Sequence, residues 1–372
     1  MMRRFIAVLI KEAREIWRDP YTLGMAIVLP LIMLFLFAYA TNLDVKDVSL
    51  AIYDQDRSRA SRDYVTLLTI GDEFHVHAWV QSSDELEHLM DNDTVEVGLI
   101  IPPGFGEALA AGQPATVQTW VDGSFPPTAN VAIGYVTAFN QVYSAREVAA
   151  LLGQPVKPAI AVAPRVSYNP GLKSVNSVVP GLFAVILLAF PPLLSALSVV
   201  REKERGSIQQ LFVSPIRPAE LILGKLIPYG VIAFVEMAVI FVAGIGWFQV
   251  PFVGSLPFLL VTALIYVFGA VSIGLLVSTV TSSQAAAMIA TIVLTMMPAL
   301  IFSGFIYPIF NMPPVMQWYT NLFPARHFVT ISRSIALKGV GLEHLWPHVG
   351  LLLAYVLVIF TMASLRFKKK VG

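Results

Sequence analysis

Long stretches of hydrophobic residues, broken by short polar segments, dominate this chain. The clearest of them runs from Met237 to Ala325 without one Asp, Glu, Lys or Arg. No water-soluble surface can be built from such a stretch, because soluble domains carry roughly a quarter of their residues as charged side chains. A helix needs only about 20 consecutive apolar residues to cross a bilayer. The pattern therefore predicts an integral membrane protein.

Six segments have the length and composition of a membrane-spanning helix. We predict these spans at residues 21–41, 174–200, 221–249, 257–281, 285–304 and 346–365. Residues 305–345 are too polar to span and too apolar for a free loop, which predicts a re-entrant region at membrane depth on the outer side. Residues 366–372 are left as a short tail.

The basic residues fix the orientation of these spans. Lys and Arg gather in three places: before the first span, directly after the second span, and at the C-terminus. With six spans all three lie on one side, and the positive-inside rule makes that side cytoplasmic. Both termini are then cytoplasmic. Residues 42–173, with sixteen acidic and eight basic side chains, face outward.

The outward segment is long enough to fold as a domain. Short β-type runs alternate with helical ones, which predicts a small α/β unit. The expected strands are Val48–Tyr53, Phe74–Val80, Val95–Ile101, Thr116–Val121 and Ala161–Tyr168. The predicted fold class is thus an α-helical integral membrane protein with six transmembrane helices and an α/β extracytoplasmic domain between the first and second spans.

Residues 1–20 predict an amphipathic helix at the cytoplasmic membrane interface, since apolar and charged positions occupy opposite arcs. Asp19-Pro20 ends it before the first span. One interpretation is a simple topology anchor, and the other is a lever that couples a cytoplasmic partner to the spans. Periodicity alone favours the anchor. The residues that would serve the lever are Lys11, Arg14, Trp17, Arg18 and Asp19.

The sequence of residues 201–220 predicts a short cytoplasmic helix between the second and third spans. It reads REKERGSIQQLFVSPIRPAE. Gly206 breaks the preceding span, and Ser207 with Gln210 forms a capping box for the new helix. Ile208, Leu211 and Phe212 then share one apolar face, and Pro215 stops the helix. An apolar face in the cytoplasm needs a partner to cover it. The alternative is a loop that lies flat on the lipid headgroups.

The stretch from Glu202 to Lys225 resembles the coupling-helix signature of ABC-2-type transporter permeases, E-x-E-R-G-T-x-E-x-L-x-x-T-P-I followed by a Gly-Lys pair. The matching positions are Glu202, Glu204, Arg205, Gly206, Leu211, Pro215, Ile216, Gly224 and Lys225. Ser207 and Ser214 replace the usual Thr residues, and Gln210 replaces an acid. The segments 11–20, 303–314 and 324–339 also resemble parts of these permeases, in the same order. The long outer segment is similar to the branch of the family to which multidrug export permeases belong.

The resemblance implies a bacterial inner-membrane export subunit without its own motor. The chain contains no G-x-x-x-x-G-K-[ST] sequence, so it lacks the phosphate cradle of a P-loop. ATP and Mg²⁺ are therefore expected on a separate ABC ATPase subunit, and no cofactor on this chain. The ATPase would dock on the Ile208/Leu211/Phe212 face together with the N-terminal helix. The other implied partners are a second permease copy or a sister permease, the lipid membrane and a periplasmic adaptor protein.

Glu236 is the one acidic residue inside a predicted span, and it should face protein or a cavity. It is either a contact for a cationic substrate or gate, or a protonated acid hydrogen-bonded to a neighbouring helix. Arg326 is the second candidate for the substrate pathway. A hydrophobic or amphiphilic substrate is expected, and a cationic drug-like one is compatible with Glu236.

Other chemistry finds little support in the sequence. His75 and His77 alternate on a predicted strand, but no third metal ligand has a clear spacing. No Ser/His/Asp group suggests catalysis, and no basic, aromatic-rich patch suggests nucleic-acid binding. The alternative function is a membrane-anchored receptor or binding module that acts through its acidic ectodomain. The cytoplasmic apolar helix argues against it, because a passive anchor does not need one.

Overall fold

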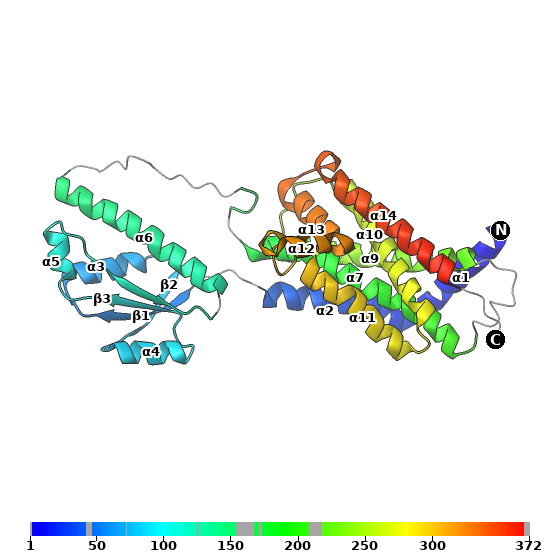
Figure 1. Ribbon diagram of the computed structural model, residues 1–372, viewed down its shortest axis with the longest axis horizontal. Coiled ribbons are helices and arrows are strands. Elements are labelled where there is room, and N and C mark those ends of the chain that lie inside the picture. The colour runs from blue at the N-terminus through cyan, green and yellow to red at the C-terminus, as the bar shows by residue number, and fades with distance from the viewer. Residues whose placement is uncertain are drawn as a thin grey trace. The chain divides into compact units, whose positions relative to one another are not determined.

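The computed structural model describes residues 2–41, 47–71, 73–124, 126–153, 167–170, 173–207 and 218–367. The chain divides into two compact units. We call Met1–Asn42 with Ser167–Gly372 the helical unit, and Leu43–Val166 the sheet unit. Figure 1 shows the helices of the first unit and the sheet of the second.

The helical unit is built around helices that are long and apolar enough to cross a membrane. Six of its helices within the described residues meet that description. They are α2 (Pro20–Ala40), α7 (Ser174–Glu204), α9 (Pro218–Gly246), α10 (Leu256–Val280), α11 (Gln284–Phe302) and α14 (Leu342–Arg366). The N-terminal α1 (Met2–Arg18) precedes them, and Pro20 is the first residue of α2. The expected count of six apolar helices is confirmed for the described part of the chain.

Helix α7 lies at the centre of the helical unit. Almost all of its side chains between Val179 and Val200 are buried, and α2, α9, α10, α11 and α13 (Pro324–Arg333) pack around it. Gly274 of α10 permits the closest approach, since a Cβ atom there would lie 1.9 Å from the carbonyl oxygen of Pro192. Ser195 donates a hydrogen bond across the same contact to the carbonyl oxygen of Val271. By contrast α14 and α11 keep apolar side chains exposed, as helices that face lipid do.

Between α11 and α14 the chain folds into short helices rather than a long span. They are the 3₁₀ turns η1 (Ile309–Asn311) and η2 (Thr320–Leu322), α12 (Pro314–Tyr319), α13, and the π-helical turn η3 (Ser334–Lys338). Arg333 of α13 anchors this region. Its guanidinium donates to the carbonyl oxygens of Ser177 on α7, Gly304 and Phe305. The residues around α13 are therefore held to the start of α7 and to the end of α11.

The sheet unit is a four-stranded mixed sheet with the strand order β2-β1-β3-β4. The strands are β1 (Val48–Asp54), β2 (Phe74–Trp79), β3 (Val97–Ile101) and β4 (Gln118–Val121). β1 runs parallel to β2 and to β3, whereas β4 is antiparallel to β3. The expected fifth strand at 161–168 lies mostly outside the described residues, and its last two residues, Ser167 and Tyr168, are not in a strand.

Helices cover both faces of the sheet (Figure 1). On one face lie α3 (Arg59–Leu68), α5 (Phe105–Ala110) and α6 (Pro126–Leu152), which enclose a core with Leu50, Ile52 and Leu99. On the other face α4 (Ser83–Asp91) inserts Leu86 against Ala51 and Ile100. Ser58 and Ser82 are the N-caps of α3 and α4, and their hydroxyls accept hydrogen bonds from the backbone N–H groups of Ser61 and Glu85. A small α/β unit between the first two apolar helices is thus confirmed.

Candidate functional site

The end of α7 carries the predicted coupling residues that the structure describes. Glu202 and Glu204 belong to its last turn, and Arg205 is its C-cap. Gly206 adopts a positive φ of 72°, the left-handed conformation that commonly ends a helix and that glycine adopts without strain. The Ser207 hydroxyl donates to the carbonyl oxygen of Glu202 at 3.3 Å. The remaining predicted coupling residues, Ile208, Leu211, Phe212 and Pro215, lie outside the described residues.

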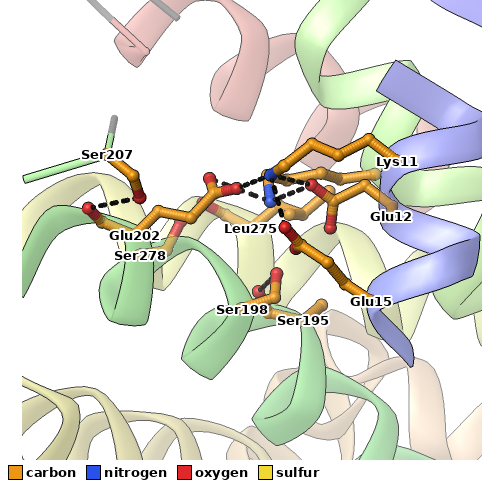
Figure 2. Close-up of polar contacts among 10 residues, drawn as sticks. Lys11, Glu12, Glu15, Ser195, Ser198, Glu202, Ser207, Leu275 and Ser278 are labelled. Atoms are coloured by element: carbon orange, nitrogen blue, oxygen red, sulfur yellow. Dashed lines mark hydrogen bonds and ion pairs between the residues drawn. The ribbon is translucent and has the colours of Figure 1, made fainter. Parts of the chain in front are cut away.

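Glu202 joins three helices through a buried charge cluster. Its carboxylate lies 3.0 Å from Nζ of Lys225 on α9 and also accepts a hydrogen bond from Lys11 on α1. Lys225 is paired in turn with Glu12 of α1 at 2.7 Å, and Lys11 contacts Glu12 and Glu15. Figure 2 shows how Lys11, Glu12 and Glu202 converge from α1 and α7. We call Lys11, Glu12, Glu202 and Lys225 the buried charge cluster.

Burial and opposite charge act together in this cluster. Glu12 and Lys225 are almost completely shielded from solvent, and Glu202 is buried. Burial alone would lower the pKa of Lys11, but the carboxylates of Glu12, Glu202 and Glu15 outweigh it and raise that pKa above its usual range. The three carboxylates lie close enough together to hold a metal ion. The ammonium groups of Lys11 and Lys225 already lie among them, and they supply the neutralising charge that such an ion would bring.

Gly224, next to Lys225, explains how α1 comes close enough to form these pairs. A Cβ atom at this position would lie 2.6 Å from Cγ1 of Val8 and 2.8 Å from its Cβ. Those distances are shorter than van der Waals contact, so only glycine lets α1 lie directly on α9. The Gly-Lys pair therefore has two roles in one turn of helix: the glycine makes room for α1, and the lysine binds its buried carboxylate.

Arg201 links α7 to the junction between α1 and α2. Its guanidinium lies 2.6 Å from the carboxylate of Asp19, which is the N-cap of α2. Asp19 also accepts hydrogen bonds from the backbone N–H groups of Tyr21 and Thr22 and from the Thr22 hydroxyl. The hydrogen bond from Thr22, with the help of Arg201, lowers the pKa of Asp19 to about 2. Asp19 thus starts the first apolar helix and holds α7 at the same time.

The next two charged residues of α7 bind two more helix ends. Lys203 donates to the carbonyl oxygens of Ser278 and Thr281 at the C-terminus of α10. Glu204 accepts hydrogen bonds from the backbone N–H and the side-chain amide of Gln284 at the N-terminus of α11. Each charge has the sign that the helix dipole favours at that end. The four consecutive residues Arg201 to Glu204 therefore connect α7 to five other helices: α1, α2, α9, α10 and α11.

Some of the predicted interface-helix residues take part in this network, and the others are exposed on the surface. Lys11 and Asp19 take part in the contacts above, whereas Arg14, Trp17 and Arg18 are exposed, Trp17 to 81%. The face of α1 that packs on α9 consists of Val8, Glu12 and Ile16. Sequence analysis missed Glu12, because a charged residue between Lys11 and Ala13 looks like part of the polar arc. Its spacing of four from Val8 and from Ile16 was the available signal.

A polar cavity of about 680 Å³ opens beside the buried charge cluster. It lies between α1, the start of α2, the end of α7 and α9. Its lining carries both signs of charge, including Glu15, Asp19, Arg201 and Arg205, with hydroxyl groups from Ser198 and Tyr229. Ser207 also lines this cavity. The residues of the predicted apolar face, which begin with Ile208, come directly after it in the chain.

The two candidates for the substrate pathway have different surroundings. Glu236 of α9 is 1% exposed, and neither carboxylate oxygen has a hydrogen-bond partner among the described residues. Arg326 of α13 donates to the carbonyl oxygen of Gln317 at 2.5 Å and to the hydroxyl of Thr320. Arg326 therefore anchors the short helices before α13, and no contact joins it to Glu236 in the described chain. Among the described residues, Glu236 is thus a buried carboxyl group of the apolar bundle without a hydrogen-bond partner.

Comparison with known proteins gives a consistent result across nearly the whole chain. Residues 20–365 match the model of a family described as ABC-2 family transporter protein. The chain is 32% identical over 369 residues to the "Probable multidrug ABC transporter permease YbhS" of Escherichia coli K12, which covers 99% of this chain and 97% of the relative. It is 31% identical to the "Probable multidrug ABC transporter permease YbhR" of the same strain, over the full length of both. It is 26% identical to its "Inner membrane transport permease YhhJ", over 100% of this chain and 98% of the relative.

Proposed function

The chain belongs to the ABC-2 family of transporter proteins, and on that premise we propose that it is the permease subunit of an exporter driven by a separate ATPase. The relatives with which it aligns end to end are named as transport permeases, which supports a multi-pass protein of the inner membrane. The proposal adds the direction of transport, the motor and its attachment point, and the class of substrate.

The connections of residues 201–204 are the observation that carries this proposal. Arg201, Glu202, Lys203 and Glu204 join the end of α7 to α1, α2, α9, α10 and α11. A displacement applied at this point is transmitted to those five helices through hydrogen bonds and ion pairs rather than through flexible loops. Such an arrangement suits a chain whose driving force arrives from outside it.

The force would be supplied by ATPase subunits on the cytoplasmic side. This chain has no P-loop, so ATP and Mg²⁺ would be bound by the partner. The ATPase would contact the apolar face of Ile208, Leu211 and Phe212 together with α1. ATP binding would draw two ATPase subunits together and push the predicted coupling helix at residues 201–220. The apolar helices would then rearrange and release substrate outward.

We propose a hydrophobic or amphiphilic substrate, and the surroundings of Glu236 favour a cationic one. A buried carboxyl group without a partner is costly, and a cationic group is the ligand that would offset this cost. The word "multidrug" in the names of the two relatives from Escherichia coli agrees with an amphiphilic class. Either a second copy of this chain or a sister permease would form the other half of the pathway. The acidic sheet unit would face the periplasm and meet an adaptor protein there, and both termini would lie in the cytoplasm.

The test is ATP hydrolysis by this protein when it is co-purified with candidate ABC ATPase subunits and reconstituted in lipid. Leu211→Asp combined with Phe212→Asp should abolish both the association and the hydrolysis. Leu151→Asp combined with Leu152→Asp is a matched control, because these two leucines are exposed on α6 of the sheet unit. The control should behave as the wild type does.

The opposite result would be equally informative. If no ATPase associates with the wild type, or if the L211D/F212D variant keeps full activity, the motor-coupled function is wrong. The alternative, a membrane-anchored receptor that works through the sheet unit, would then be favoured. In that case ligand binding should survive in the isolated acidic region and should not depend on ATP.

A further inference from the structure

The histidines of the helical unit lie close together. The helical unit holds three of the six, and all three lie on two neighbouring elements: His327 on α13, and His344 and His348 on the first two turns of α14. Helices α13 and α14 pack against each other. The other three histidines, His75, His77 and His88, belong to the sheet unit. Neither the family resemblance nor the proposed export function assigns a role to the three in the helical unit.

Two of these rings already point at each other. Nδ1 of His327 lies 3.0 Å from Nδ1 of His348. The other ring nitrogen of His327, Nε2, lies 3.0 Å from the carbonyl oxygen of Asn321. A carbonyl oxygen can only accept, so Nε2 of His327 must carry the hydrogen, and its Nδ1 presents a lone pair toward His348. A ring nitrogen fixed in this way by a backbone carbonyl is the usual second contact of a metal-binding histidine.

The spacing of the two nitrogens matches a pair of metal ligands. Zinc binds histidine nitrogens at about 2.0–2.1 Å in tetrahedral geometry, which separates two ligand atoms by about 3.3 Å. The observed 3.0 Å differs from that by only a few tenths of an ångström.

His344 is the third histidine of this group. It precedes His348 by four residues on α14, and two histidines at that spacing lie on one face of a helix, as in helical zinc motifs. The ring of His344 is exposed, and its Nδ1 lies 3.4 Å from a carboxylate oxygen of Glu343. To join the pair it must change rotamer, which an exposed side chain can do at little cost.

We propose that His327, His344 and His348 form a binding site for a transition-metal ion of the zinc class. Charges of both signs lie near the three histidines. Arg326 on α13 adds a positive charge that opposes a cation, and its guanidinium donates to the neutral oxygens of Gln317 and Thr320. Glu343 on α14 carries the opposite charge beside His344, and its carboxylate also accepts a hydrogen bond from the backbone N–H of Gly341. The site would fasten α14, which is largely exposed, to α13, which packs on α7.

The experiment is a Zn²⁺ titration of the full-length protein in detergent, purified through a tag that contains no histidine. The three sheet-unit histidines are first replaced, in H75Q/H77Q/H88Q, so that the remaining histidines are the three of the proposed site. This background should bind one Zn²⁺ per chain, and Co²⁺ in its place should give the visible absorption of a tetrahedral complex. His344→Gln and His348→Gln should each weaken binding at least about tenfold, since one of three ligand bonds is lost. Zn²⁺ should also raise the melting temperature of the background protein and not that of His348→Gln.

The variants are chosen so that misfolding does not decide the result. His344 and His348 are not fully buried, and the melting temperature without metal will show whether each variant keeps its fold. Absence of Zn²⁺ binding by a folded H75Q/H77Q/H88Q protein would overturn the proposal. So would binding that survives unchanged in both His344→Gln and His348→Gln. In either case His327 and His348 form only a hydrogen-bonded pair in which one ring donates to the other.

Discussion

Lys225 on α9 and Glu12 on α1 form an ion pair, 2.7 Å between Nζ and Oε1, in which only 2% and 1% of the two side chains are exposed. The same ammonium lies 3.0 Å from Glu202 on α7, so one buried cation joins three helices. Removing one partner of a buried pair leaves an uncompensated charge, which costs more than the intact pair contributes. The contact between α1 and the bundle should therefore be sensitive to each of these residues.

The first prediction concerns Lys225. Lys225→Met should destabilise the protein by about 3–5 kcal/mol, because Glu12 and Glu202 are left buried with a single ammonium, that of Lys11. Thermal unfolding in detergent, followed by intrinsic fluorescence, measures this change. Lys173→Met, at an exposed position, is the control and should have little effect. Combining Lys225→Met with Glu12→Met should recover part of the loss, and a double variant as unstable as the sum of both changes would refute the assignment.

The second prediction concerns Gly224. Gly224→Ala should destabilise the protein by about 1–3 kcal/mol, since its Cβ would overlap Val8 and force α1 away from α9. Gly246→Ala, on the same helix but with open space around it, should be neutral or slightly stabilising. Val8→Ala in the Gly224→Ala background removes the closest atom, Cγ1, and should restore part of the stability. Equal melting temperatures for the two glycine variants would contradict the close approach of α1.

Sequence analysis predicted the apolar helices and the small α/β unit because both depend on local signals. Runs without charged residues mark the apolar helices, and the alternation of short β-type runs with helical ones marks the sheet unit. It also singled out Glu202 and Glu204 and expected a break at Gly206. The residues that Glu202 and Glu204 contact could not be predicted, because they lie up to about 190 residues away in the sequence, as Lys11 does from Glu202.

Two kinds of site residue were not predicted from the sequence. Glu12 was hidden because a charged residue on an amphipathic helix normally faces water, and only the packing of α1 on α9 buries it. The roles of Arg326 and Arg333 were not predicted, because their hydrogen-bond acceptors are largely backbone carbonyl oxygens. Every residue has such an oxygen, so the amino-acid sequence does not indicate which one is used. For Ile208, Leu211, Phe212 and Pro215, which lie outside the described residues, the coupling role stays a prediction.

The third prediction is a pH dependence that belongs to Asp19. Its pKa is about 2 in the folded protein and 3.8 ordinarily, so the folded state favours the ionised form. The stabilisation is complete above the ordinary pKa and is lost as the pH falls toward 2, by at most about 2 kcal/mol. Asp19→Asn keeps a capping oxygen but loses this titration. Melting temperatures between pH 6 and pH 2.5 should therefore fall more steeply for the wild type than for Asp19→Asn.

A control separates Asp19 from the other carboxyl groups. Glu87→Gln replaces an exposed acid in the sheet unit and should leave the acid-induced fall unchanged. If Asp19→Asn and the wild type lose stability in parallel, Arg201 and Thr22 do not stabilise the carboxylate in the way that the hydrogen bonds suggest.

The last prediction concerns the opposite end of α7 from the charged residues 201–204. There Arg333 donates to three carbonyl oxygens, at 2.9 Å to Ser177, 2.8 Å to Gly304 and 3.2 Å to Phe305. Gly181 makes room for the guanidinium, because a Cβ atom there would lie 2.8 Å from Nη2. Arg333 thus ties α13 to the start of α7 and to the end of α11.

Arg333→Met keeps most of the side-chain volume but leaves the three carbonyl oxygens without this donor, which should cost about 3–5 kcal/mol. Arg333→Lys has a compact ammonium that cannot reach all three acceptors, so its melting temperature should fall between those of the wild type and Arg333→Met. Arg366→Met, at an exposed position, is the control. If Arg333→Lys is as stable as the wild type, one contact is sufficient, and the fork of the guanidinium is not what holds α13. If both variants are equally unstable, the planar geometry is essential, and Gly181→Ala should then produce the same loss by displacing the guanidinium.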